Sequence, residues 1–178
     1  MTLLTTHPEG LTGVRLAVEL YGERDINPVT LRAELSRLRQ LLGDDLRSRP
    51  YRLRTTPATD LDDVDDALRA HDLTGALAAC RGPVLPRSEA PGIARVRQRT
   101  EHRLRHALLL HRDAGALTEW VSSPHGEEDL AAWEALLTVS PAAGRGVPAA
   151  RVEALRAAYG LPGRGAEPGA TSPQRAGG

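Results

Sequence analysis

The sequence predicts a mainly helical protein with one small β-hairpin. Of the 178 residues, 40% are apolar but only 3% are aromatic and none is Phe, so Leu, Ala and Val must fill the core. Leu and Ala are strong helix formers, whereas strands favour β-branched and aromatic side chains. Apolar residues recur mainly at helical spacing, and they alternate with polar residues in one short stretch only.

The first of two predicted regions, 1–56, begins with two helices. Thr12 is a suitable N-cap for a helix that ends at Tyr21, before Gly22. Asn27 is a suitable N-cap for a second helix at 28–42, because Pro at the first helical position loses no hydrogen bond. The core-facing positions of the second helix are Leu31, Leu35, Leu38 and Leu42. Its opposite face is therefore small, polar and basic.

Residues 46–54 predict a hairpin beside this helix, because Leu46, Tyr51 and Leu53 alternate with arginines around a Ser-Arg-Pro turn. Such a hairpin is typical of the wing of a DNA-binding winged helix-turn-helix. Between residues 27 and 57 there are seven Arg and three acidic residues, the local basic excess that nucleic-acid binders carry. The residues expected to contact DNA are Asn27, Thr30, Arg32, Ser36, Arg37, Gln40, Arg47, Arg49 and Arg52.

Within that set, different contacts are expected from the helix and from the hairpin. Arg32 and Arg37, on the helix, are the better candidates for contacting bases in the major groove. Most of the other contacts would go to phosphates, which set the register without recognising sequence. Arg39 lies nearer the core-facing side, so we expect it to pair with a carboxylate. The same arginines could instead form a solvated basic face.

A linker at 57–60 leads to a second region, 61–160, that is predicted to be helical. The expected helices are 61–70, 73–80, 93–111, 114–121, 128–139 and 148–159, with Trp120 and Trp133 as core anchors. One face of the 93–111 helix carries Arg95, Arg99, His102 and His106. This face could bind nucleic acid, but we favour contact with acidic blocks such as 60–72, within the domain or in a dimer. The Gly- and Pro-rich tail, 161–178, is expected to be disordered.

Several segments resemble a known family. TLRAELSRLRQLLG (30–43) and RPYRL (49–53) resemble the recognition helix and wing of response-regulator-type winged helices, and ALAACRGPVLP (76–86) resembles the bacterial transcriptional activator domain, which has tetratricopeptide-like helix pairs. With HPEGL (7–11), YG (21–22) and LPRSEAPG (85–92), they are similar to GAF-domain-containing transcriptional regulators of high-GC bacteria. Members carry a GAF sensor and a complete first helix before HPEGL. Because six residues precede that segment here, we expect a truncated first helix and no sensor.

The resemblance implies a sequence-specific DNA-binding transcriptional regulator, or its C-terminal fragment. Helix 28–42 would enter the major groove and wing 46–54 would contact the backbone. The implied partners are double-stranded DNA, a second copy in a homodimer that binds two half-sites, and the transcription machinery. The alternative interpretation is a helical protein-interaction module whose degenerate winged helix no longer binds DNA.

No constellation of residues indicates an enzyme, a cofactor or a metal site. His102 and His106 have metal-ligand spacing, but arginines surround them and no Cys or carboxylate pattern completes a site. Cys80 ends an apolar helix face, as a small core residue would, and a single Cys suits the reducing cytoplasm. No apolar stretch reaches the about 18 residues of a membrane span, so we expect a cytoplasmic protein with no membrane partner.

Overall fold

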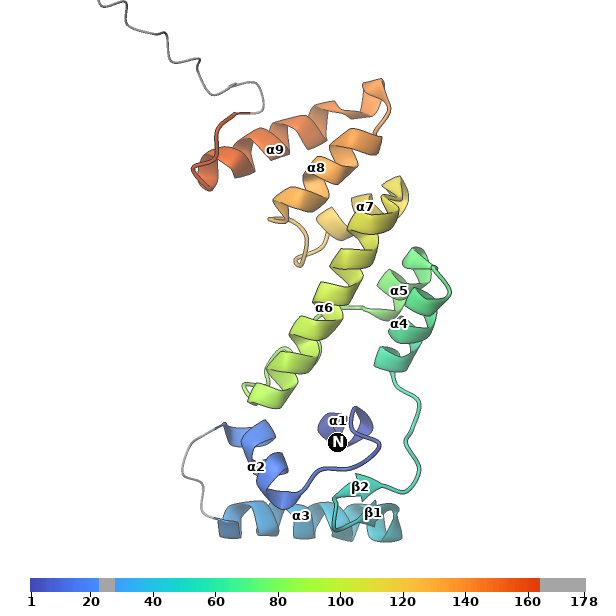
Figure 1. Cartoon of the computed structure of the whole chain (residues 1–178), viewed down its shortest axis with the longest axis vertical. Coiled ribbons are helices and arrows are strands. Elements are labelled where there is room, and N and C mark those ends of the chain that lie inside the picture. The colour runs from blue at the N-terminus through green and yellow to red at the C-terminus, as the bar shows by residue number, and fades with distance from the viewer. Residues whose placement is uncertain (23–27, 164–178) are drawn as a thin grey trace, which may run out of the picture. The chain divides into compact units, whose positions relative to one another are not determined.

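The computed structural model describes residues 1–22 and 28–163 and is mainly helical, with one two-stranded antiparallel sheet (Figure 1). The predicted fold class is confirmed at this level. The elements are α1 (Thr2–Thr5), α2 (Gly13–Tyr21), α3 (Pro28–Leu42), η1 (Gly43–Asp45), β1 (Leu46–Arg47), β2 (Arg52–Leu53), α4 (Asp60–Arg69), α5 (Leu73–Ala79), α6 (Pro91–His111), α7 (Ala114–Val121), α8 (Leu130–Val139), η2 (Ala142–Gly144) and α9 (Gly146–Ala158). No helix within the described residues has the length and apolar character needed to cross a membrane.

The chain divides into two compact units, Met1–Ala107 and Leu108–Gly178, and the long helix α6 continues from one into the other. The predicted linker, 57–60, falls inside the first unit. Residues 57–59 have no regular structure, and Asp60 already belongs to α4. The helices α4 and α5 therefore belong to the same unit as α1–α3 and the hairpin.

Local sequence signals account for the ends of α2 and α3. The Thr12 side chain accepts a hydrogen bond from the Arg15 N–H (3.2 Å), and this caps α2 as predicted. Gly22 and Gly43 follow α2 and α3 with φ of 77° and 55°, a left-handed conformation that favours glycine. Asn27, the expected cap of α3, lies outside the described residues.

A leucine-rich cluster holds α1, α2, α3 and the start of α6 together. Its buried members are Leu3, Leu11, Leu16, Leu31, Leu35 and Ile93. The short α1 also supplies Leu4 to a second cluster, in which Leu46 and Leu53 of the hairpin are buried. Burial of one such side chain contributes roughly 1.5–3 kcal/mol, so a single turn of helix is an effective anchor for both clusters.

One ion pair connects α2 to α6. The carboxylate of Glu19 is almost fully buried, with 7% of its side chain exposed. It accepts a hydrogen bond from Arg95 of α6, and Arg15 Nε lies 3.5 Å from its other oxygen. A buried charge without such a partner would cost several kcal/mol, so this pair aligns the two helices.

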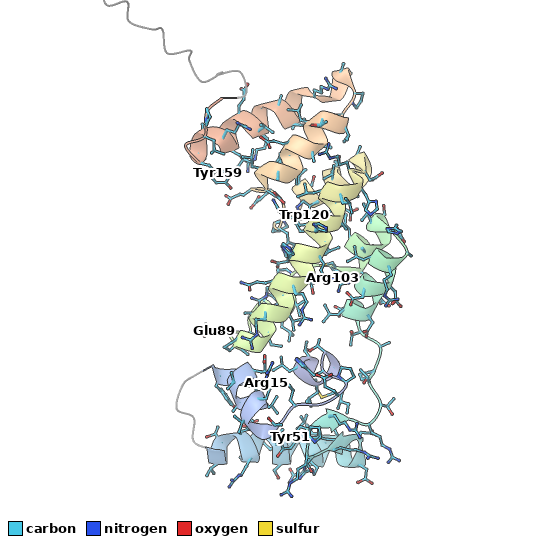
Figure 2. All side chains as sticks on the ribbon, viewed as in Figure 1. Arg15, Tyr51, Glu89, Arg103, Trp120 and Tyr159 are labelled. Atoms are coloured by element: carbon cyan, nitrogen blue, oxygen red, sulfur yellow. The ribbon has the colours of Figure 1, made fainter. Side chains whose placement is uncertain are left out.

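The remaining helices of the first unit are held by caps and by a further ion pair. The Thr59 side chain and Asp62 form a capping box at the start of α4, and Asp72 caps α5. α4 and α5 pack against each other. Arg103 of α6 pairs with Asp65 of α4 (Figure 2).

The second unit contains α7, α8 and α9, with α8 packed against both of the others. Trp120 is buried as expected, and its Nε1–H donates to Asp129, which also caps α8. Trp133 is only half-buried, and its Nε1–H donates to the Glu127 carbonyl at 3.0 Å. Arg156 of α9 forms two hydrogen bonds, of 2.9 and 2.6 Å, with Glu134 of α8.

We predict that Gly92→Ala destabilises the first unit by about 1–3 kcal/mol, the usual effect of overpacking. A Cβ at Gly92 would lie 2.8 Å from Leu3 Cδ2 and 2.9 Å from the backbone oxygen of Glu19, which cannot move without displacing α2. The measurement is the midpoint of urea unfolding, followed by circular dichroism. Gly146→Ala is the control, because nothing lies within 4 Å of its added Cβ. Equal midpoints for the two variants would contradict this packing.

Candidate nucleic-acid interface

Helix α3 presents one polar face to solvent. Leu31 and Leu35 are buried, whereas Leu38 and Leu42 are half-buried against the hairpin cluster. The predicted contact residues on the opposite side are all exposed: Thr30, Arg32, Ser36, Arg37 and Gln40. The helical periodicity therefore identified the exposed face correctly.

An ion pair on this face differs from the one that the sequence suggested. Arg37 Nη1 lies 2.7 Å from the Glu34 carboxylate, one helical turn away. Both side chains are largely exposed, so the pair contributes little to stability. Its main effect is to orient the Arg37 guanidinium. Arg39, which we expected to pair, is exposed and has no carboxylate partner among the described residues.

The hairpin separates apolar and basic side chains between its two faces. Leu46 pairs with Leu53 across the strands, and both are buried. Arg47 pairs with Arg52, and both are exposed. Directly opposed residues of an antiparallel pair point to the same face, and like charges there repel each other. The hairpin thus places two arginines on one exposed face, and neither has a carboxylate partner among the described residues.

The hairpin is tied to α1, to α3 and to the segment that precedes α2, which positions the backbone of these arginines. Tyr51 exchanges two backbone hydrogen bonds with Leu11, of 2.9 and 2.8 Å, and its side chain contacts both leucine clusters (Figure 2). β1 also contacts α3 (Figure 1). Arg49 lies in the turn with a φ of 82° and is exposed.

The chemistry of this surface favours an anionic ligand. Within residues 1–22 and 28–163, Arg32, Arg47, Arg49 and Arg52 make no ion pair. Guanidinium groups bind phosphate oxygens in a bidentate manner, and two arginines on one face suit a phosphodiester backbone. Because the leucines of the hairpin are buried on one face and its arginines are exposed on the other, the guanidinium groups are accessible to a ligand.

The basic residues of α6 serve mainly internal contacts. Arg95 pairs with Glu19 and Arg103 with Asp65, as noted above. Asp65 belongs to an acidic block that we expected α6 to contact, but Arg103 was not on the predicted face and Glu19 lies in the first predicted region. The other members of the predicted face, Arg99, His102 and His106, are exposed. Among the described residues no three His, Cys, Asp or Glu side chains gather in a way that could hold a metal ion.

Cys80 has the surroundings of a structural thiol. It is half-buried at the end of α5, and its Sγ lies 3.8 Å from the Gly82 carbonyl. Burial raises the pKa of the thiol, and the negative charges of Glu101 and Asp60 raise it further. A thiol with a raised pKa is a poor nucleophile at neutral pH.

Two important residues escaped the sequence analysis. Glu19 carries the helix-joining ion pair, and Glu34 orients Arg37. Glu19 follows Leu16 by three positions on α2, so it lies on the core-facing side of an amphipathic helix. A carboxylate at such a position requires a cationic partner. Sequence spacing does not show which residue this is, because Arg95 lies 76 positions away.

A family model and a known protein each match part of the chain. Residues 113–161, which contain α7–α9, match the family model described as the third C-terminal helical domain of YTH3-like proteins. An uncharacterized 47.3 kDa protein in the thcA 5' region of Rhodococcus erythropolis is 47% identical over 139 residues. That alignment covers 78% of this chain, and the chain spans about a third (32%) of the relative's length. No solved structure matches the chain.

We predict that Cys80 is alkylated slowly by iodoacetamide, with a rate that rises at higher pH than that of free cysteine. The thiolate is the reacting form, and the raised pKa means that deprotonation requires a higher pH. The measurement is the rate of alkylation between pH 7 and 10, followed by intact mass. The same protein unfolded in urea is the control. A folded rate equal to the unfolded rate across this range would show that burial does not protect the thiol.

Proposed function

We propose that this chain is a sequence-specific DNA-binding transcriptional regulator, or the C-terminal part of one. In this proposal the first unit is a winged helix-turn-helix of the response-regulator type. The observation that carries it is the facing pair Arg47 and Arg52 on the exposed side of the hairpin. Opposed like charges cost stability, and a bound phosphate backbone would relieve that repulsion.

The two elements would have different roles on the duplex. α3 would lie in the major groove, where its exposed Thr30, Ser36 and Gln40 allow close approach and hydrogen bonding to base edges. Arg32 and Arg37 would contact bases from the same face. The wing arginines would bind phosphates and so set the register of α3.

The helices from α4 onward would then supply contacts other than DNA. The α4–α5 pair is consistent with the tetratricopeptide-like packing of a bacterial transcriptional activator domain. We propose that these helices mediate homodimerisation or contact with the transcription machinery in the cytoplasm. Binding, rather than catalysis, would be the activity of the chain.

A second candidate is a helical protein-interaction module that does not bind DNA. The ion pair between Arg37 and Glu34 favours it, because one of the two arginines proposed to contact bases already has a partner. The match of residues 113–161 to a helical domain also fits this role. Under this interpretation the wing arginines are a solvated surface.

Salt dependence separates these two functions. We predict that the chain binds a pool of random duplex DNA at low salt and that its affinity falls steeply between about 50 and 200 mM salt, because binding releases counterions. The measurement is fluorescence anisotropy of labelled duplexes, with circular dichroism of the same sample to establish that it is folded. A folded chain that does not bind DNA at low salt would favour the interaction module.

Two arginine variants test the assigned roles. We expect Arg37→Ala to weaken binding to a duplex selected from the pool by about 1–3 kcal/mol, and to weaken binding to random DNA much less. Arg47→Ala should weaken both similarly and lower the salt slope by about one. Arg87→Ala, at an exposed position between α5 and α6, is the matched control and should change neither. Equal losses for Arg37→Ala on both duplexes would show that Arg37 does not read bases.

A further inference from the structure

A cavity of about 600 Å³ lies between α1, α2, α3 and the segment that precedes α6. It is partly open to solvent, and leucines of the core form its floor. It has the volume of a small-molecule site, and all of its lining belongs to the first unit.

The wall of the cavity is mostly apolar. Its main contributors are Leu3, Leu16, Leu20, Leu31, Leu35 and Ile93. Five of these are also buried members of the cluster that supports the inward face of α3, namely Leu3, Leu16, Leu31, Leu35 and Ile93. An occupant would therefore contact the helix whose outer face is proposed to contact DNA.

A strained leucine lies at the rim of this cavity. Leu85 lines the cavity, is 48% exposed and has a φ of 44°, a left-handed conformation that is uncommon for leucine. Arg97 of α6 holds it there by donating hydrogen bonds to the carbonyls of Val84 (3.0 Å), Leu85 (2.7 Å) and Ser88 (3.2 Å). The protein thus maintains an unfavourable backbone conformation that places an apolar side chain over an apolar space.

The polar lining determines which end group suits the cavity. Glu34 provides a carboxylate, and it is the acidic residue of the lining. Ser88 adds a hydroxyl. An occupant with an apolar body and a positively charged, hydrogen-bond-donating end would match this arrangement.

We propose that the cavity is a binding site for a small aliphatic amine, with the apolar chain against the leucines and the ammonium group against Glu34. The ammonium would compete with Arg37, which lies 2.7 Å from the same carboxylate. Its release would leave the Arg37 guanidinium free on the exposed face of α3. The effect of the amine on DNA rests on the proposed function, whereas its binding to the cavity does not.

Three ligands that share one alkyl chain and differ only in their end group test the site. Octylamine, 1-octanol and octanoate are titrated into the full chain at pH 8 by displacement of the apolar dye N-phenyl-1-naphthylamine. We expect octylamine to bind about tenfold more tightly than the other two, the effect of one charge-assisted hydrogen bond. Failure of all three to bind, or equal binding of the three, would overturn the proposal.

Two variants locate the ligand. Glu34→Gln keeps the shape of the side chain and removes the charge, so the preference for octylamine should disappear. Glu9→Gln, an exposed position outside the cavity lining, should leave the preference intact. Ala90→Leu, which fills the half-buried wall, should weaken binding of all three ligands, with circular dichroism as the check on folding. A preference for octylamine that survives Glu34→Gln would contradict the assigned position of the ammonium.

DNA binding provides a separate readout. Saturating octylamine should raise the affinity for DNA by about fivefold, as expected for a coupling between two sites. Glu34→Gln should have a similarly raised affinity and should not respond to octylamine. If octylamine binds but leaves DNA affinity unchanged, the site stands and its link to Arg37 is refuted. If the chain binds no DNA, the dye titration still decides whether the site exists.

Discussion

Burial of Glu19 beside Arg95 is the constraint on which the arrangement of the first unit depends. A carboxylate with 7% exposure is stable only where a guanidinium reaches it, and Gly92 permits the close approach that this requires. Around the pair, Leu3 and Ile93 complete the cluster formed by α2 and α3. Residues 1–56 bury little surface by themselves, so the isoleucine from α6 matters for the stability of this cluster.

This packing fixes the backbone that carries the exposed arginines of the hairpin. Because Leu46 and Leu53 are buried and Tyr51 is hydrogen-bonded to Leu11, the hairpin cannot turn without loss of core contacts. Arg47 and Arg52 are consequently kept at paired positions on one face of the hairpin. The backbone of this surface is ordered before a ligand arrives, which lowers the entropy lost on binding.

Leucines of the same core also line the cavity beside the inward face of α3. Glu34 lies at the border between the two surfaces, since it lines the cavity and also pairs with Arg37. The second unit is built differently, because Trp120, Asp129 and the Arg156–Glu134 pair hold α7–α9 through contacts among themselves. The match of residues 113–161 to a family model coincides with these three helices.

Local sequence determined where α2 and α3 begin and end, which face of α3 is exposed, and which residues form the hairpin. Thr12, Gly22 and Gly43 act within a few residues of their own positions, and leucine spacing at 31–42 reflects only helical geometry. The tertiary structure alone decided that Arg95 joins Glu19, that Arg37 rather than Arg39 has a carboxylate, and that Ile93 enters the leucine cluster. These contacts depend on which side chains meet in space, and neither helical period nor capping chemistry specifies the partner of a residue that lies 76 positions away.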